Sequence, residues 1–285
     1  MKILILGGAG MLGHQLWRHF HVDHEVWVTL RRPASSYAAF GLFEPTRALT
    51  GVDATNMESL VSVFRSVKPD AVVNCIGIIK QLKEAHNPLI SLNINSVLPH
   101  RLAELSTLIG ARLVHISTDC VFSGLKGSYT EEDVSDAEDL YGRTKFLGEV
   151  HAPHCVTLRT SIIGRELETK SGLIEWFLSQ HGRAIKGYRR AIYTGFTTLA
   201  LARIVEEVLL RQRQLSGLWQ VSSEPITKYD LLTLAQRAFD WQGNIVADDT
   251  FVCDRSLDSI RFRQQAGFTP PSWDSMLTEL ARSAI

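Results

Sequence analysis

The sequence has few cysteines, no excess of charge of either sign and no long hydrophobic run. Its four cysteines lie far apart in 285 residues and form no Cys-x-x-Cys pair. This spacing argues against a disulfide framework and against a zinc site, and it fits a reducing cytosol. Thirty Lys and Arg residues balance thirty Asp and Glu residues, so no net field draws the chain to nucleic acid or to an anionic membrane.

The hydrophobic segments are all short. None approaches the roughly 18 apolar residues that a membrane-spanning helix needs. The N-terminal MKILILGG has a lysine and an apolar run, but the run stops at glycine after four residues, which is too short for a signal peptide. These features predict a cytoplasmic protein with neither a membrane nor a nucleic acid as partner.

Short apolar runs alternate with helical patterns as far as Gly164. Continuous Val-, Ile- and Leu-rich strands separated by helices predict a parallel sheet covered on both faces, which is a Rossmann-type, doubly wound α/β fold. Such a sheet binds its ligand at the carboxyl ends of the strands. The predicted strands are 3–6, 25–30, 71–76, 112–117 and 155–162, and the predicted helices are 11–20, 60–67, 88–110 and 141–150.

The pattern changes beyond Gly164, where helices dominate. We predict helices at 172–180, 199–213 and 229–239 and from Trp273, with a strand at 218–222. Residues 1–164 are predicted to form a Rossmann domain to which 191–222 returns. Residues 165–285 are predicted to form mainly a smaller, discontinuous lobe.

A glycine-rich loop joins the first strand to the first helix, with four glycines in the seven residues GGAGMLG. Glycine lets the backbone turn tightly and approach a pyrophosphate, whose charge is stabilised at a helix N-terminus. A plain strand-to-helix turn rarely needs so many glycines. The loop residues predicted to bind a dinucleotide are Gly7, Gly10, Met11, Leu12 and Gly13.

The second strand ends in Leu30-Arg31-Arg32, without an acid. An acid at this point usually accepts the ribose 2′-hydroxyl of NAD, whereas a 2′-phosphate calls for arginine. Arg31 and Arg32 therefore favour NADP(H), although NAD(H) is also possible. The alternative is that the two arginines simply form a solvated basic loop without a ligand. Asp53 suits either the adenine amino group or the cap of a helix.

Polar and small residues follow the strands predicted at 71–76 and 112–117. Cys75, Ile76 and Gly77 stand at the end of the strand 71–76, where a small residue lets the backbone pass close to a cofactor, and Asn95 lies in the next helix. These four residues are predicted cofactor contacts, although packing explains them too. Thr118 stands at the end of the strand 112–117, where its hydroxyl suits a substrate carbonyl oxygen or a simple turn.

Tyr141 and Lys145 lie four residues apart and so share one face of a helix. An ammonium beside a phenol stabilises the phenolate. Such a pair is by itself usually an exposed helix pair, but here it follows a strand-terminal hydroxyl and a glycine-rich loop. The three motifs together predict proton exchange with a carbonyl or alcohol oxygen beside a nicotinamide, with Thr118, Tyr141 and Lys145 as catalytic residues and no metal.

These motifs resemble the dTDP-4-dehydrorhamnose reductase family of the extended short-chain dehydrogenase/reductase superfamily. The resemblance covers nearly the whole chain and is carried by STDCVFSG, YGRTKFLGE, LRTSIIG, TGFTTLALARIV, GLWQVSS and DRSLDSIRFRQQAGF. It implies that Thr118 orients the 4-keto oxygen of a nucleotide-linked 6-deoxyhexose and that Tyr141 protonates it. It also implies that Lys145 holds the nicotinamide ribose and lowers the pKa of Tyr141, while NADPH reduces C4 of the sugar.

The sequence departs from the family pattern at Cys120, where a tyrosine is usual, and the segment before Tyr141 lacks the usual proline. These departures leave the sugar nucleotide open, including a UDP-linked deoxysugar. An epimerase, a dehydratase and a non-catalytic NADP-binding regulatory subunit compete with the reductase hypothesis, and a homodimer is left open. The residues predicted to hold the substrate diphosphate, unless they form solvated loops, are Lys80, Gln81, Arg189, Arg190 and Tyr193.

Overall fold

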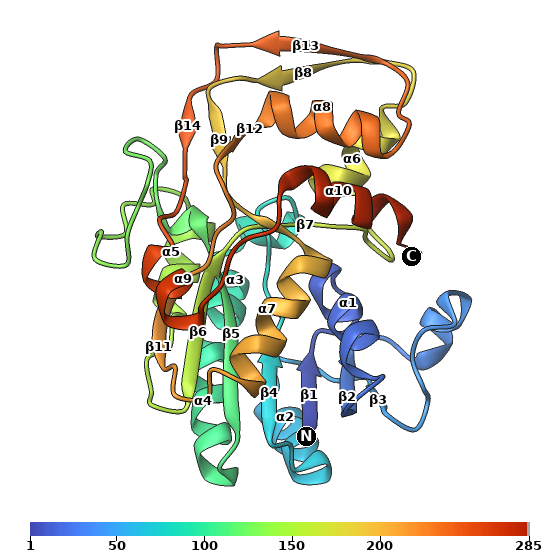
Figure 1. Ribbon diagram of the computed structural model, residues 1–285. Coiled ribbons are helices and arrows are strands. Elements are labelled where there is room, and N and C mark those ends of the chain that lie inside the picture. Colours follow the sequence, from blue (N-terminus) through green and yellow to red (C-terminus); the bar gives the residue numbers. More distant parts are fainter. Residues whose placement is uncertain (284–285) are drawn as a thin grey trace. The chain divides into compact units, whose positions relative to one another are not determined.

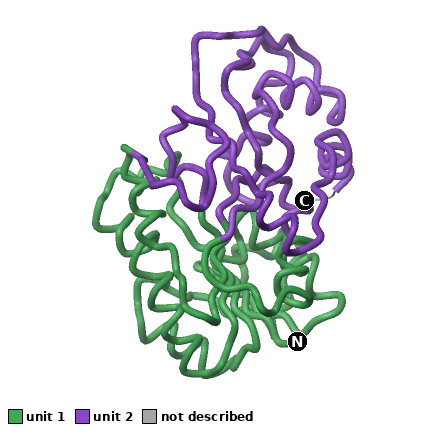
Figure 2. Tube along the Cα trace, turned by 60° about the vertical axis from the view of Figure 1, so that its left-hand side comes forward, with its two compact units in different colours: residues 1–117, 138–158, 202–218 green, residues 118–137, 159–201, 219–285 purple. Residues whose placement is uncertain are grey.

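The computed structural model describes residues 1–283 and divides into two compact units (Figure 2). Unit 1 contains residues 1–117, 138–158 and 202–218, and unit 2 contains residues 118–137 and 159–201 and the chain from Trp219 onward. The chain therefore passes between the units several times. The predicted division into a cofactor domain and a substrate lobe concerns binding and stays a prediction.

A seven-stranded sheet, most of it in unit 1, has the order β11-β6-β5-β4-β1-β2-β3 (Figure 1). The pairs β1–β2, β1–β4, β2–β3 and β4–β5 are parallel. The strand order reverses between β1 and β4, and at such a point parallel sheets bind their ligands. The strands are β1 (Lys2–Leu6), β2 (Glu25–Leu30), β3 (Ala48–Thr50), β4 (Ala71–Asn74), β5 (Arg112–Thr118), β6 (Cys155–Thr160) and β11 (Gly217–Gln220).

Both faces of the sheet are buried. In β1, Ile3 and Leu4 point to opposite faces and neither is exposed. Leu4 packs with residues of α2 (Met57–Val67) and α4 (Leu98–Ile109) in one core cluster. The helices α1 (Met11–Phe20) and α7 (Thr198–Leu210) are joined by the His19 ring and the Glu206 carboxylate, whose Nε2 and Oε2 atoms lie 2.8 Å apart. The predicted Rossmann-type α/β fold is confirmed.

The predicted single helix over 88–110 is wrong in its middle. The segment forms α3 (Pro88–Ser91), a π-helical segment η3 (Leu92–Val97) and then α4. Pro99 has no N–H to donate and its ring crowds the carbonyl of Asn95, so a wider turn relieves the clash. The predicted stop at Gly110 is confirmed, because this glycine ends α4 with φ of 69°.

The other predicted elements of unit 1 agree with the structure within a few residues. The helix 11–20 and the strand 25–30 have the predicted bounds, whereas the strand predicted at 71–76 ends at Asn74 and the strand predicted at 155–162 is interrupted after Thr160. The helix predicted at 141–150 is α5 (Leu140–Leu147). Short 3₁₀ turns were not predicted: η1 (Ala34–Phe40), η2 (Lys83–His86) and η4 (Asp119–Val121).

Unit 2 contains small sheets that the sequence did not predict. The sheets are β10–β7, β12–β9–β14 and β13–β8. The strands are β7 (Ile162–Ile163), β8 (Ala184–Tyr188), β9 (Ala191–Tyr193), β10 (Phe196–Thr197), β12 (Ile226–Thr227), β13 (Asn244–Asp248) and β14 (Cys253–Asp254). The helices, which the sequence did indicate in most cases, are α6 (Leu173–Ser179), α8 (Lys228–Ala238), α9 (Ile260–Ala266) and α10 (Trp273–Arg282).

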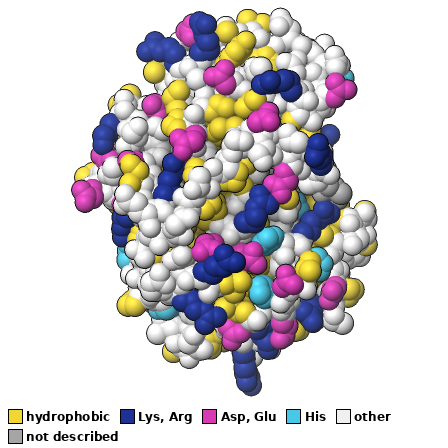
Figure 3. Space-filling model, in the orientation of Figure 1, with side chains coloured by type: hydrophobic (Ala, Val, Ile, Leu, Met, Phe, Trp, Pro, Cys, Tyr) yellow, Lys and Arg dark blue, Asp and Glu magenta, His cyan; other side chains and the backbone are white. Residues whose placement is uncertain are grey.

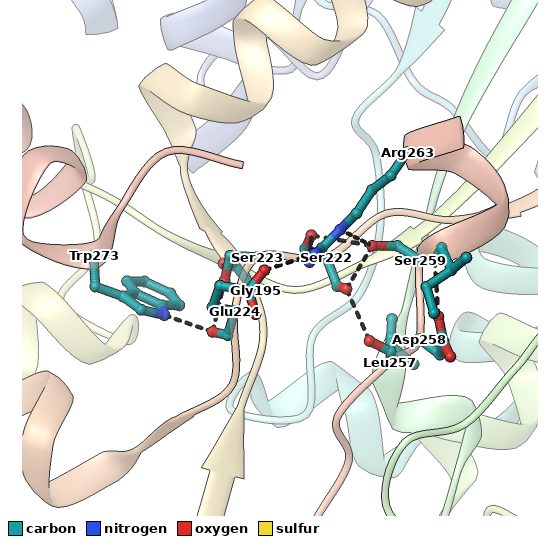
Figure 4. A network of polar contacts seen from close by, with 10 residues as sticks. Gly195, Ser222, Ser223, Glu224, Leu257, Asp258, Ser259, Arg263 and Trp273 are labelled. Carbon is teal, nitrogen blue, oxygen red and sulfur yellow. Dashed lines mark hydrogen bonds and ion pairs between the residues drawn. The ribbon is translucent and has the colours of Figure 1, made fainter. Parts of the chain in front are cut away.

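A polar network joins the end of β11 to the C-terminal segments of unit 2 (Figure 4). The Ser222 hydroxyl donates to the Leu257 carbonyl at 2.8 Å and contacts the Ser259 hydroxyl at 2.9 Å. The Trp273 indole N–H donates to the Glu224 carbonyl at 2.8 Å. Satisfied buried polar groups of this kind fix one arrangement of loops that have few backbone partners.

Charged side chains of both signs are interspersed on the face of the molecule that Figure 3 shows. This distribution agrees with the equal counts of basic and acidic residues in the sequence. Within residues 1–283, no helix has the length and apolar character needed to cross a membrane.

The core of unit 1 gives a test of the packing on α2. Phe64 is 2% exposed in the core cluster, whereas Val61 on the same helix is 43% exposed. We expect Phe64→Ala to lower the free energy of unfolding by about 3–5 kcal/mol, because it leaves a cavity. The matched control Val61→Ala should change it by less than about 1 kcal/mol. Urea denaturation followed by circular dichroism measures both, and equal effects would contradict this packing.

Candidate functional site

The glycine-rich loop closes onto the end of β2. The Gly7 N–H donates to the Thr29 hydroxyl at 3.1 Å and the Gly8 N–H donates to the Thr29 carbonyl at 2.9 Å. Gly7 has φ of 83°, a left-handed conformation that favours glycine. The loop then enters α1 at Gly10, which caps the helix without a side-chain hydrogen bond. The first N–H groups of α1 are therefore left for another partner.

The glycines of this region fall into two groups. A Cβ on Gly8 would lie 1.8 Å from a methyl of Val28, and one on Gly13 would lie 2.2 Å from the Gly7 carbonyl oxygen. The protein's own packing thus requires these two glycines. A Cβ on Gly10 would come no closer than 3.3 Å to its nearest neighbour, and one on Gly77 no closer than 3.6 Å. Packing therefore restricts these two positions less strictly than Gly8 and Gly13, and their contact with a cofactor stays a prediction.

The basic pair at the end of β2 is exposed. The Arg32 guanidinium lies over the Tyr37 ring at 5.2 Å from its centroid, and Tyr37 is buried in η1. Stacking on an aromatic ring restricts the arginine to one direction. Asp53 uses one carboxylate oxygen to accept from the Thr55 N–H at 2.8 Å and from its hydroxyl at 2.7 Å. These hydrogen bonds lower the pKa of Asp53, and they form a turn just before Asn56 caps α2.

Asn95, in the π-helical segment, connects the loop after β4 to α5. Its Oδ1 accepts from the Ile78 N–H at 2.8 Å, and its Nδ2 donates to the Ile78 carbonyl at 3.0 Å. Nδ2 also lies 3.2 Å from the Thr144 hydroxyl, next to Lys145. The predicted cofactor residue thus fixes the surroundings of the Tyr-Lys helix, and direct contact with the cofactor stays a prediction. Burial raises the pKa of the Cys75 thiol to about 12.

The helix α5 begins where the Asp139 carboxylate accepts from the Gly142 N–H at 2.7 Å. Tyr141 is half-buried in its first turn, and Lys145 is 5% exposed one turn later. The Lys145 ammonium donates to the Ile116 carbonyl of β5 at 2.8 Å. Burial lowers the pKa of Lys145 to about 8, and the Glu149 carboxylate opposes this shift. Unit 1 therefore contains a lysine whose proton is unusually easy to remove.

The segment after β5 is the first part of unit 2. The Thr118 hydroxyl accepts from the Cys120 N–H at 3.1 Å and lies 3.2 Å from the Asp119 carboxylate. Thr118 thus forms the simple turn that the sequence analysis gave as the alternative to a catalytic role. Its catalytic role stays a prediction. Burial raises the pKa of Asp119, and the Arg255 guanidinium opposes this shift. The same guanidinium lies 3.9 Å from the Cys120 sulfur.

The residues predicted to hold the substrate lie in different settings. Lys80 and Gln81 are exposed in the loop after β4. Arg189 and Arg190 are exposed between β8 and β9, and the Arg189 guanidinium pairs with the Asp249 carboxylate at 2.9 Å. Tyr193 is buried in β9, which raises the pKa of its hydroxyl. Their contact with substrate stays a prediction.

Two residues near Lys145 were quoted in the sequence motifs without a role. The Ser117 hydroxyl donates to the Glu149 carboxylate at 2.8 Å, and both side chains are buried. Glu149 lies two residues beyond the end of α5. Its place in the motif YGRTKFLGE was the signal that could have drawn attention to it.

The strand order of the sheet reverses between β1 and β4, next to the glycine-rich loop that leads into α1. A buried lysine lies on the nearby helix α5. These features place the chain in the class of Rossmann-type nucleotide-binding proteins. The chain belongs to the RmlD substrate binding domain family, whose model matches residues 1–237. The resemblance that the motifs indicated is confirmed at the level of the family.

Individual relatives are distant. The chain is 24% identical to the dTDP-4-dehydrorhamnose reductase of Aggregatibacter actinomycetemcomitans, with 98% of each chain covered. It is 28% identical over 150 residues to the methionine adenosyltransferase 2 subunit beta of Rattus norvegicus, covering 52% of this chain and 41% of that subunit. The match thus spans about two fifths of that relative's length. The crystal structure of the Bacillus anthracis dTDP-4-dehydrorhamnose reductase in complex with NADP is 21% identical, has a TM-score of 0.79 and covers 98% of each chain, which shows the fold.

Metal ligands do not gather in the structure. Among residues 1–283, no group of three or more His, Cys, Asp and Glu side chains is arranged to hold a metal ion. The four cysteines are all free.

The two groups of glycines predict different effects on stability. We expect Gly13→Ala to lower the free energy of unfolding by about 1–3 kcal/mol, because the new methyl overlaps the Gly7 carbonyl. Gly10→Ala should change it by less than about 1 kcal/mol, because φ of −71° suits alanine and the new Cβ would lie 3.3 Å from the Gly7 carbonyl oxygen, a contact that a small shift relieves. Thermal and urea denaturation measure both variants. A Gly10→Ala protein as unstable as Gly13→Ala would show that the fold itself requires both glycines.

Proposed function

We propose that the protein is an NADPH-dependent reductase that acts on the 4-keto group of a nucleotide-linked 6-deoxyhexose. The observation that carries the proposal is the buried Lys145 ammonium, fixed on the Ile116 carbonyl one helical turn after Tyr141. Family membership supports the same reaction class. The nucleotide is proposed to be dTDP, as in the name of the full-length relative from Aggregatibacter, with a UDP-linked sugar as the second candidate.

The chain's own residues perform the proton transfer. Tyr141 donates its phenolic proton to the carbonyl oxygen as that oxygen gains negative charge. The ammonium of Lys145 makes this easier, because a nearby cation stabilises the phenolate that remains. The Thr118 hydroxyl donates to the same oxygen and fixes its direction. Bound NADPH supplies the reducing equivalent for C4 of the sugar.

The cofactor is proposed to bind unit 1. Gly7 and Gly13 shape the loop that precedes α1, Gly10 would lie beside the pyrophosphate at the start of α1, and Gly77 would let the nicotinamide half pass the end of β4. Arg31 and Arg32 bind the 2′-phosphate, with Arg32 held by Tyr37.

The sugar nucleotide is proposed to bind mainly unit 2. Its candidate residues there are Arg189, Arg190 and Tyr193, and Lys80 and Gln81 of unit 1 are further candidates for contact with the diphosphate. Arginine and lysine side chains suit this role because they make charge-assisted hydrogen bonds to phosphate oxygens.

The reaction gives a direct test. We expect oxidation of NADPH, followed at 340 nm, when dTDP-4-dehydro-6-deoxyhexose is added, and we expect Tyr141→Phe to lower kcat by about 10²- to 10⁴-fold. The phenylalanine retains the ring but has no proton to give, so NADPH affinity should remain close to that of the wild type. The UDP-linked sugar is assayed in parallel and identifies the nucleotide.

A protein that binds NADPH but reduces neither sugar nucleotide would contradict the reductase proposal. That outcome would favour a non-catalytic NADP-binding subunit, and the supporting observation is that one partial relative is named as a subunit, methionine adenosyltransferase 2 subunit beta. Equal turnover by wild type and Tyr141→Phe would instead remove Tyr141 from the mechanism.

The choice of cofactor is tested separately. We expect Arg31→Ala to weaken NADPH binding by about 10- to 100-fold, because a charge-assisted hydrogen bond to phosphate contributes roughly 1.5–3 kcal/mol. NADH binding should change little, since NADH has no 2′-phosphate. Fluorescence titration measures the affinity of wild type and variant for each cofactor. Equal losses of affinity for NADPH and for NADH would count against a 2′-phosphate site at Arg31. Lys83→Ala, which changes an exposed lysine in η2, is the matched control.

A further inference from the structure

Glu149 lies four residues after Lys145 and two residues beyond Leu147, where α5 ends. The chain after the helix is held close to the protein, because a Cβ on Gly148 would lie 1.9 Å from the Asn95 carbonyl oxygen. This close approach keeps Glu149 inside unit 1, where it is 5% exposed. One carboxylate oxygen accepts from the Ser117 hydroxyl at 2.8 Å.

The other titratable groups around Lys145 come from several elements. Cys75 follows β4, and burial raises its pKa to about 12, so the thiol is neutral. His115 lies in β5, where burial lowers its pKa well below the usual range and leaves the ring neutral. Its Nδ1 lies 3.1 Å from the Asn74 side-chain nitrogen. Tyr141 precedes Lys145 on α5. Lys145 and Glu149 are both buried and contact consecutive residues of β5, Ile116 and Ser117, so the Glu149 carboxylate lies where its charge favours the ammonium.

We propose that Glu149 is a positioning residue whose buried carboxylate keeps Lys145 protonated and directed toward the end of β5. The inference rests on the proposed function, since it gives Glu149 a role in the same site. Glu149 acts through Lys145 and does not itself touch the reacting atoms.

The sign of the effect follows from the two opposing causes. Burial disfavours the ammonium and lowers the pKa of Lys145 to about 8 even with Glu149 present. Removing the carboxylate's charge leaves desolvation unopposed, so the proton is lost at a still lower pH. An uncharged Lys145 neither stabilises a phenolate at Tyr141 nor attracts the electron-rich oxygens of a cofactor. Cofactor binding should then weaken as pH rises through the new, lower midpoint.

NADPH binding as a function of pH tests this role without any sugar substrate. Wild type, Glu149→Gln and Ser117→Ala are titrated with NADPH by fluorescence between pH 6 and pH 9. The glutamine keeps an oxygen that accepts from Ser117 but has no charge, whereas Ser117→Ala removes the hydrogen bond and keeps the carboxylate. Comparing these two variants therefore separates the effect of the carboxylate's charge from the effect of its hydrogen bond with Ser117.

We expect Glu149→Gln to move the midpoint of the pH dependence downward by about one unit. Its NADPH affinity should then fall roughly fivefold relative to wild type at pH 8 and less than twofold at pH 6, because at pH 8 the charged fraction of lysine drops from about one half to about one tenth. Ser117→Ala should keep the wild-type midpoint.

A uniform loss of affinity in Glu149→Gln, with an unchanged midpoint, would overturn the proposal and leave Glu149 a structural role. If Glu149→Gln does not fold, Glu149→Asp is measured instead. Because it keeps the negative charge, it must show the wild-type midpoint, and a midpoint one unit lower in Glu149→Asp would also overturn the proposal. Failure of wild type to bind NADPH at every pH is a different result, because it removes the proposed function itself.

Discussion

The arrangement of the candidate site depends on how α5 contacts the end of β5. Lys145 donates to the Ile116 carbonyl, and Ser117 donates to the Glu149 carboxylate. In the first contact α5 donates to the strand, and in the second the strand donates to the residue two positions beyond the end of α5. Together they fix the position of α5 along the strand, because a one-residue shift would separate both donor–acceptor pairs at once. Tyr141 thereby lies one turn before a lysine whose ammonium is held by the Ile116 carbonyl.

The π-helical segment makes this contact geometrically feasible. Pro99 offers no N–H to the Asn95 carbonyl, and that carbonyl faces the backbone at Gly148, where no Cβ would fit. The Asn95 side chain meanwhile links Ile78 to Thr144. The π-helical segment thus supports the position of α5 through the Asn95 side chain and through the close approach of its backbone to Gly148.

The fold was predictable because periodicity and glycine positions carry it locally. Alternation of apolar strands with amphipathic helices predicted the parallel sheet, and Gly110 predicted the end of α4. The π-helical segment was not predictable from periodicity, because the spacing of apolar residues does not show how the backbone adjusts around Pro99, which has no N–H for the Asn95 carbonyl. The short strands β8, β9, β13 and β14 were missed because few apolar residues mark strands that pair in small sheets.

In the candidate site, the residue types were predictable from the sequence, but the environment that sets their chemical state was not. The sequence supplied Tyr141 and Lys145 as a pair, but the state of the lysine depends on burial and on Glu149, which only the folded structure brings to bear. Asp53 and Thr118 show the converse, because both use their side chains in local turns. The Thr118 hydroxyl accepts from the Cys120 N–H and so keeps a fixed direction. Its role in the turn is therefore compatible with its proposed contact with a substrate carbonyl oxygen. A residue that forms a local turn can therefore be rigid enough to orient a substrate.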